Sequence, residues 1–323
     1  MTEKNRYPFI VSPEVRSIYR KFDMLRRVPY VSEGNLNLLL TGESGLGKSE
    51  LLKRYERRNF RVDEGFRTRV PVLYVNIRSP KTMKAFLSEI LISLGDPQNG
   101  VAKDSRTALK TLSMLCSTCG VELILLDEAQ TLMQNRSLGV LATIADWVRD
   151  LADAVGVPIV LTGMPWCEGF VDSYEQISTR FGYRHRLDDY MVSKRFNRYV
   201  TFTGKYLAAL SEDNKVDVSD KDFAFRMFSH TSGRLRATTG LLNVAHELSK
   251  EAGRPLNKQY VIGAAVLQKG DMNSFTESIG KITLQEVVSP SQWVNQKGYS
   301  RERHIPPVYD TYKVNNDYTL VRQ

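Results

Sequence analysis

Eight consecutive residues, 42–49, have the types and spacing of a phosphate-binding loop. They fit the pattern G-x-x-x-x-G-K-[ST] at every required position, and an apolar run precedes them. The candidate nucleotide-binding residues are Gly42, Glu43, Ser44, Gly45, Leu46, Gly47, Lys48 and Ser49. In this pattern backbone N–H groups surround a phosphate chain, the lysine reaches the β- and γ-phosphates, and the hydroxyl ligates Mg2+. The pattern predicts ATP with Mg2+ as ligand; the alternative is a glycine-rich turn that matches by accident.

A pair of carboxylates, Asp127 and Glu128, could complete the chemistry. They end the apolar run Leu123 to Leu126, which is typical of a parallel strand buried on both faces. Asp127 could join the Mg2+ shell, and Glu128 could polarise a water for in-line attack on the γ-phosphate. The alternative is an ordinary strand that ends in a polar turn. Together with the phosphate loop, the pair predicts nucleotide hydrolysis.

These motifs require parallel strands and helices to position them. Apolar strands at 36–40, 70–77, 121–126 and 157–163 alternate with helical patterns at 48–59, 81–94, 105–119 and 138–155. Such alternation predicts an α/β fold with a doubly wound parallel sheet. From about residue 193 only helical spacing follows, at 196–210, 221–229, 235–251 and 257–268.

The expected domains follow from this order. Residues 1–30 form an N-terminal arm with a short helical pattern, and residues 31–192 form the α/β nucleotide-binding domain. Residues 193–280 form a small all-α lid. Residues 281–323, with little periodicity and scattered aromatics, form a C-terminal tail, which either docks on a partner or packs on the lid.

Charge points to a polyanionic partner. The 323 residues carry 45 lysines and arginines against 36 acidic residues, a formal net charge of +9. Basic residues cluster between 53 and 69 and again between 180 and 198, and nucleic acid is the usual partner of such a balance. The alternative is that each cluster is a solvated helix face.

The cysteine count and the hydropathy of the chain indicate the cellular compartment in which we expect the protein. Three cysteines, Cys116, Cys119 and Cys167, do not suggest a disulfide framework. Cys116 and Cys119 form a C-x-x-C without a second pair or a histidine at zinc spacing, so we expect buried small side chains there. We see no run of eighteen apolar residues and no signal peptide, and we expect a soluble, cytoplasmic protein that does not contact a membrane.

Three short strings carry a family resemblance. They are Leu125-Leu126-Asp127-Glu128-Ala129-Gln130, Leu161-Thr162-Gly163-Met164-Pro165, and Val75-Asn76 before a helix that leads to Leu94-Gly95-Asp96-Pro97. An α/β nucleotide domain followed by a helical lid resembles the P-loop AAA+ ATPases. Within that class the strings resemble the TniB/TnsC family of transposition ATPases, and the modest length is similar to the compact versions in CRISPR-associated Tn7-like transposons. The resemblance covers roughly residues 30–265.

The resemblance implies roles for further residues. Thr162 stands at the sensor 1 position, next to the attacking water or the γ-phosphate. Arg180 stands at the position of the finger that reaches the neighbouring subunit's nucleotide, with Arg184 and Arg186 as alternatives. Arg236 stands at the sensor 2 position on the lid. Arginine suits such roles because its planar fork pairs with phosphate oxygens at two points.

The resemblance also implies partners. ATP would stabilise a homo-oligomeric ring or spiral that encloses duplex DNA, recruits a transposase and links it to a target-selection protein. The candidate DNA-binding residues are Lys81, Lys84, Lys103 and Arg106, each with plain solvent exposure as the alternative. Two other classes are considered: a replication-initiator or clamp-loader ATPase, and a secretion-linked AAA+ ATPase. Basic charge and the lack of an apparent membrane segment count against the second.

Overall fold

The computed structural model describes residues 7–28, 37–134, 136–187, 190, 192–269, 273–288 and 308–323. By their contacts these residues divide into two units. The described residues between 14 and 187 form the α/β unit. Those between 190 and 288, together with 7–13 and 308–323, form the helical unit.

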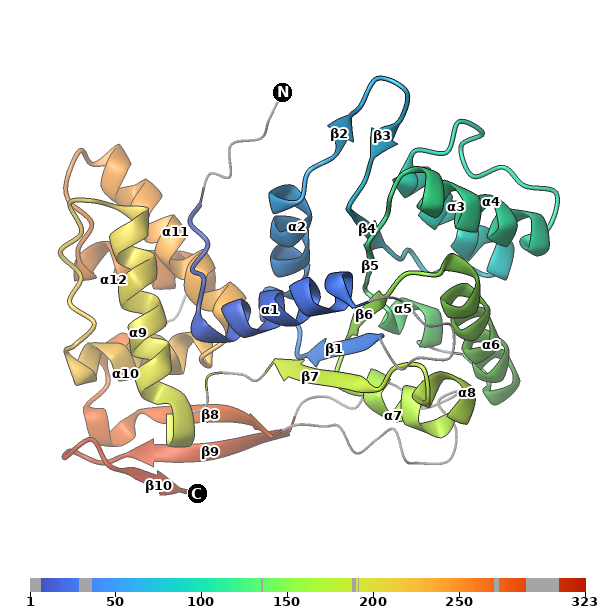
Figure 1. Cartoon of the computed structure of the whole chain (residues 1–323). Helices are drawn as coiled ribbons and strands as arrows, with labels where there is room; N and C mark the ends of the chain where they lie inside the picture. The colour runs from blue at the N-terminus through green and yellow to red at the C-terminus, as the bar shows by residue number, and fades with distance from the viewer. Residues whose placement is uncertain are drawn as a thin grey trace. The chain divides into compact units, whose positions relative to one another are not determined.

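The α/β unit is built on a five-stranded parallel sheet in the order β4-β5-β6-β1-β7 (Figure 1). Its strands are β1 (Leu38–Gly42), β4 (Val72–Asn76), β5 (Leu123–Asp127), β6 (Ile159–Gly163) and β7 (Tyr183–Leu187). Its helices are α1 (Pro13–Arg27), α2 (Lys48–Arg58), α3 (Met83–Leu94), α4 (Ser105–Thr118), α5 (Gln130–Met133), α6 (Leu138–Val155), α7 (Cys167–Ser173) and α8 (Glu175–Ser178). This arrangement confirms the predicted doubly wound fold.

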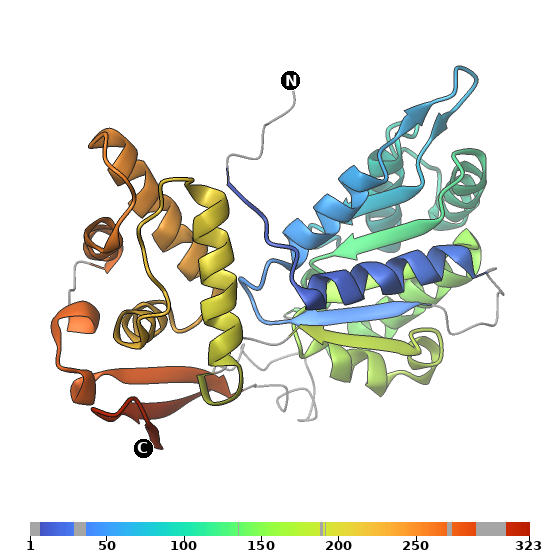
Figure 2. The ribbon, with the colours of Figure 1, turned by 60° about the vertical axis from the view of Figure 1, so that its left-hand side comes forward.

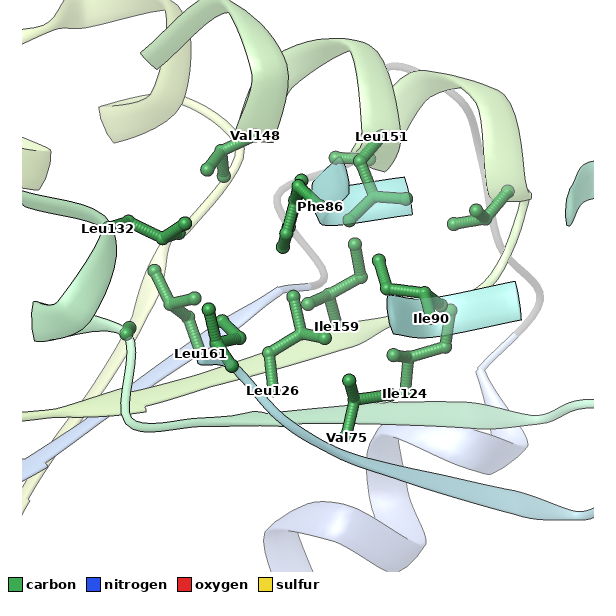
Figure 3. Packing of buried hydrophobic residues seen from close by; sticks show 14 of the residues in the cluster. Val75, Phe86, Ile90, Ile124, Leu126, Leu132, Val148, Leu151, Ile159 and Leu161 are labelled. Carbon is green, nitrogen blue, oxygen red and sulfur yellow. The ribbon is translucent and has the colours of Figure 1, made fainter. Parts of the chain in front are cut away.

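Helices cover both faces of the sheet. On one face, Phe86 of α3 and Val148 and Leu151 of α6 pack over strand residues such as Leu126 and Leu161 (Figure 3). On the other face, α1 and α2 lie together (Figure 1). Strands β1, β5 and β6 are buried along their whole length. Because both faces are covered, every strand residue there must be uncharged until the carboxyl end, where the candidate site begins.

Two elements of this unit differ from what the sequence leads us to expect: an edge strand that periodicity does not reveal, and a helix whose packing it does not reveal. The edge strand β7 reads Tyr-Arg-His-Arg-Leu, and only Leu187 in it is buried. An edge strand needs no apolar run, so its composition does not reveal it. Helix α1 lies in the segment that we expected to be an arm, but it buries Ile18, Phe22 and Leu25, and the Tyr19 hydroxyl donates to Leu51 O of α2 at 3.0 Å. By contact this helix belongs to the α/β unit.

A two-stranded hairpin, β2 (Val62–Asp63) and β3 (Thr68–Arg69), connects α2 to β4. Arginines of the basic cluster between residues 53 and 69 form hydrogen bonds and ion pairs in and next to this hairpin. Arg61 donates to Ser93 O and Leu94 O, Arg67 pairs with Glu64 at 2.7 Å, and Arg69 pairs with Glu122 at 2.6 Å. Part of this cluster is therefore paired within the fold.

The helical unit contains α9 (Val192–Leu210), α10 (Lys221–Thr231), α11 (Leu235–Glu251) and α12 (Lys258–Lys269), as the sequence predicts. Short elements α13 (Asn273–Thr276) and η1 (Ile279–Lys281) follow. The described part of the expected tail forms an antiparallel sheet of β8 (Thr283–Val288), β9 (Val308–Val314) and β10 (Leu320–Arg322), shown in Figure 2. Leu284 and Val314 join the helical core with Phe228 and Leu241. Among the described helices, we find none with the length and apolar character needed to cross a membrane.

Candidate nucleotide site

The phosphate loop runs from the last residue of β1 to the first residue of α2. Gly45 and Gly47 have φ angles of 87° and 84°, a left-handed conformation that glycine adopts without strain. Gly42 is required for space, because a Cβ there would lie 2.9 Å from Leu187 Cβ. The α2 N-terminus thus points its free N–H groups into the loop, as a phosphate site requires.

Lys48 is buried although its side chain is cationic. Only 8% of it is exposed, and its Nζ donates to Gly42 O at 2.7 Å and Glu43 O at 2.9 Å. Burial lowers the pKa of Lys48, and the nearby carboxylates of Glu128 and Asp127 oppose that shift. The ammonium group is therefore held against the loop, next to the two acidic residues.

Asp127 ends β5 and is fixed by two donors. The Tyr74 hydroxyl on neighbouring β4 donates to Oδ2 at 3.0 Å, and the backbone N–H of Glu128 donates to Oδ1 at 3.0 Å. Burial, then the charge of Asp127, raises the pKa of Tyr74, so this hydroxyl stays a donor. A carboxylate that is 1% exposed is thus held in one orientation at the carboxyl edge of the sheet.

Glu128 follows directly in a left-handed backbone conformation with φ of 60°. Such a conformation is unfavourable for a residue with a Cβ and clusters at functional sites. The side-chain amide of Gln130 donates to Glu128 Oε2. The turn that follows β5 therefore holds the Glu128 carboxylate by a backbone conformation and by a hydrogen bond from Gln130.

Three buried polar atoms near this edge have no hydrogen-bond partner among the described residues. They are Thr162 Oγ1 on β6, Glu43 Oε1 in the loop, and Gln130 Oε1 at the start of α5. Thr162 is fully buried, and its carbonyl accepts from Ala129 N at 2.9 Å, which ties β6 to the turn after Asp127. Native proteins rarely leave buried polar atoms unpaired, so these atoms fit a polar ligand and its water.

Arg180 lies at the amino ends of the parallel strands, opposite to the carboxyl ends where the phosphate loop lies. It follows α8, and its carbonyl accepts from the N–H of Asn37, which precedes β1. Its guanidinium pairs with Asp153 at 2.6 and 2.7 Å. A strand of five residues separates these amino ends from the loop, about 17 Å. Arg180 therefore does not join the phosphate loop of its own chain.

The other predicted arginines are placed as follows. On β7, Arg184 pairs with Asp172 at 3.2 Å and donates to Phe181 O, while Arg186 is half-buried. Arg236 lies in the first turn of α11 in the helical unit with an exposed side chain.

The four candidate DNA-binding residues are all exposed. Lys81 and Lys84 lie at the N-terminal end of α3, and Lys103 and Arg106 lie at that of α4. Lys84 Nζ donates to Lys103 O at 3.5 Å, so the structure brings these two segments together. Because α3 follows the carboxyl end of β4, this basic patch lies at the same edge of the sheet as the phosphate loop.

Sequence reasoning missed two residues that orient the acidic pair. Tyr74 stands within an apolar strand, where an aromatic residue signals core packing alone. Gln130 belongs to the D-E-A-Q string, but the string carried a resemblance and no role for the glutamine. Only the register of β4 with β5 and the fold of the turn after β5 reveal their contacts.

Comparisons with solved structures show similar folds. The ORC2 protein of Aeropyrum pernix, solved as ADPNP-ADP complexes, matches with a TM-score of 0.58 and 18% identity over 86% of this chain and 74% of that chain. The CDC6P protein of Pyrobaculum aerophilum matches with a TM-score of 0.57 and 16% identity over 82% of this chain and 70% of that chain. The Aeropyrum pernix ORC1 protein in complex with DNA matches with a TM-score of 0.54 and 20% identity over 83% of this chain and 68% of that chain. At these identities the likeness concerns the fold, that of P-loop AAA+ ATPases.

Sequence comparison gives the family. A search of curated proteins finds no match. The family model described as "Bacterial TniB protein" matches residues 2–190, which is more than half of the chain and includes the phosphate loop, Asp127, Glu128 and Thr162. The chain therefore belongs to the TniB family and has the fold of the AAA+ ATPases.

Proposed function

We propose that this chain hydrolyses ATP at the carboxyl edge of its parallel sheet. The observation that supports this most directly is the convergence there of the Lys48 ammonium, the fixed Asp127 carboxylate and three buried polar atoms without partners. Lys48 would bind the β- and γ-phosphates, and the loop N–H groups would surround them. Glu128 would take a proton from the attacking water, and Thr162 Oγ1 would hydrogen-bond to the γ-phosphate or to that water.

Mg2+ would neutralise charge between the β- and γ-phosphates and so stabilise the transition state. Asp127 and Ser49 would hold it. Their environment fits a hard cation: the Asp127 carboxylate is buried and oriented by Tyr74, and Ser49 lies half-buried in the first turn of α2. Both are oxygen ligands, which Mg2+ prefers.

Hydrolysis would be coupled to assembly. Arg180 lies at the edge of the sheet that the phosphate loop of its own chain does not reach, so we propose that it acts on the nucleotide of a neighbouring copy. Arg184 and Arg186 are the alternatives on β7. Arg236 would touch the nucleotide from the helical unit. Such a chain would form an ATP-dependent ring or spiral.

The family match favours a role in transposition. We propose that the assembly encloses duplex DNA through phosphate contacts from Lys81, Lys84, Lys103 and Arg106, and that it regulates transposition by linking a target-selection protein to a transposase. The exposure of all four basic residues at one edge supports the DNA contact. The solved structure of ORC1 with DNA has a similar fold, but the family favours transposition over replication initiation.

The assignment of roles is tested with two variants. Lys48→Ala should weaken ATP binding at least about tenfold, because a charge-assisted contact to the phosphates is lost. Glu128→Gln should keep ATP affinity but lower the hydrolysis rate by about 10²- to 10⁴-fold, because a general base is removed. Fluorescent-nucleotide titration and phosphate release measure the two effects. Equal ATP affinity of Lys48→Ala and wild type would overturn the site.

A further inference from the structure

The side chain of Gln130 holds the carboxylate that would act as base. Gln130 begins α5, two residues after Glu128. Glu128 has a left-handed backbone conformation, and Gln130 Nε2 donates to Glu128 Oε2. An ionised carboxylate only accepts hydrogen bonds, so the nitrogen of the amide must face it. This fixes the amide orientation, and Gln130 Oε1 points away from Glu128.

The oxygen of the same amide is a buried acceptor. Gln130 Oε1 has no hydrogen-bond partner among the described residues. It lies against Gly163, the residue after Thr162, where a Cβ would come within 3.2 Å of it. The missing side chain of Gly163 thus lets the amide oxygen approach the end of β6. A buried acceptor without a donor is costly, and at a site of this kind it indicates an absent donor.

The chemistry of hydrolysis gives such an acceptor a role. A water that directs a lone pair at the γ-phosphorus has two O–H groups to place, and one of them goes to Glu128. The ammonium group of Lys48 cannot accept the other. Each oxygen of Asp127 already accepts one hydrogen bond, from Tyr74 or from the Glu128 N–H, and its remaining lone pairs are assigned to Mg2+. The Thr162 hydroxyl also carries a hydrogen, which it can donate to the γ-phosphate. Gln130 Oε1 can only accept, and it is free to do so.

We propose that Gln130 holds both the base and the attacking water: its Nε2 fixes the Glu128 carboxylate and its Oε1 accepts the second hydrogen of the water. This rests on the proposed ATP hydrolysis. The water oxygen bonds to the γ-phosphorus, the bond from phosphorus to the bridging oxygen breaks with its electron pair going to ADP, and the proton passes to Glu128. The amide of Gln130 exchanges no proton.

The test uses the full-length chain and steady-state ATP hydrolysis. Gln130→Ala should lower kcat by about 10²-fold, because the water and its base lose their alignment, while KM and analogue affinity stay within about twofold. Gln130→Glu, of nearly the same shape, should be at least as slow, because it places a second carboxylate beside Glu128. Gln134→Ala, at an exposed residue after α5, is the matched control and should retain wild-type kcat.

A double-mutant cycle separates this role from a structural one. Because Glu128 and Gln130 act on one water, Glu128→Gln/Gln130→Ala should be no slower than Glu128→Gln alone. If Gln130 only stabilised the turn, the two losses would multiply and analogue affinity would fall as well. That result, or a kcat within twofold of wild type for Gln130→Ala, would overturn the inference. Absence of hydrolysis in the wild-type chain would instead overturn the proposed function.

Discussion

Single residues at the candidate site are held in costly states. Lys48 is charged but buried, Glu128 has a left-handed backbone, and Thr162 Oγ1 has no partner among the described residues. Each state lowers stability unless something compensates for it. The donors around Asp127 show the opposite case, in which both oxygens are satisfied. This contrast indicates that the site is built to bind a polar ligand and not to maximise stability.

The cost of burying Lys48 predicts a pH dependence of stability. Burial lowers its pKa in the folded chain below the ordinary 10.5, so between the two values the unfolded chain binds more protons and the free energy of unfolding rises with pH. In Lys48→Met this contribution is absent. The stability of wild type relative to Lys48→Met should therefore increase as pH approaches 10.5, in urea denaturation without nucleotide.

Taking the difference in free energy of unfolding between wild type and Lys48→Met cancels the contribution of the other titrating groups. Lys205→Met, at an exposed lysine of α9, serves as control and should keep the wild-type pH slope. A stability difference between wild type and Lys48→Met that does not change with pH would show that Lys48 is not desolvated in the folded chain.

At the scale of elements, close packing between strand ends and the helices that follow them shapes the site. Gly163 ends β6, and Cys167, the first residue of α7, packs against it with a fully buried thiol. Burial raises the pKa of Cys167 to about 12, so it packs as a neutral side chain. A Cβ on Gly163 would lie 2.7 Å from Cys167 Sγ.

This contact predicts that Gly163→Ala destabilises the fold. Overpacking of a closed interior costs about 1–3 kcal/mol, and urea denaturation would measure it. Cys167→Ala in the same chain should recover part of the loss, because it removes the clashing sulfur. Gly139, near the start of α6, has no atom within 4 Å of an added Cβ, so Gly139→Ala should not destabilise. Equal stability of Gly163→Ala and wild type would show that the interior yields to an added methyl group.

At the scale of the whole molecule, the excess of positive charge is divided between structure and surface. Several arginines of the cluster near residue 60 are paired within the fold. Lys81, Lys103 and Arg106, in contrast, are exposed. The net charge of +9 by itself does not locate a nucleic-acid surface. We therefore place the proposed DNA contact at the exposed basic residues beside the phosphate loop.

We expect duplex DNA binding to require ATP or a non-hydrolysable analogue, to tolerate any sequence, and to weaken with salt by a slope of about −0.9 per phosphate neutralised. Lys103→Ala should lower that slope by about one without changing ATP affinity. Fluorescence anisotropy on unrelated duplexes measures this, with Lys205→Ala as control. Tight binding without nucleotide, or preference for one sequence, would contradict the assembly on DNA.

Sedimentation, together with the DNA-binding assay, tests assembly through Arg180. Arg180→Ala should abolish analogue-dependent oligomers in sedimentation, and with them DNA binding, because we propose that this arginine acts on the nucleotide of a neighbouring copy. Arg149 offers a matched control: it forms similar surface ion pairs, with Asp146 at 2.7 Å and Asp150 at 2.8 Å, and Arg149→Ala should assemble normally. Unchanged oligomers in Arg180→Ala would direct the search to Arg184 and Arg186.

The sequence by itself determined the features that depend on neighbouring residues. The buried strands are continuous apolar runs, and the phosphate loop is one uninterrupted motif, so β1, β4, β5 and β6 and the helices α2, α3, α4 and α6 between them could be predicted within a few residues. The roles of Lys48, Asp127 and Glu128 were predicted in the same way and stay predictions. The family followed from short strings that the match to residues 2–190 supports.

Tertiary structure decided the features that depend on distant pairing. The polar strand β7 exists because β1 offers it an edge, and the sheet of β8, β9 and β10 forms because segments on either side of residues 289–307 pair. The contact from Tyr74 to Asp127 follows from the register of two strands, and the partner of Arg180 follows from the packing of α8 on α6. Such contacts join residues far apart in the chain, and local composition carries no signal of them.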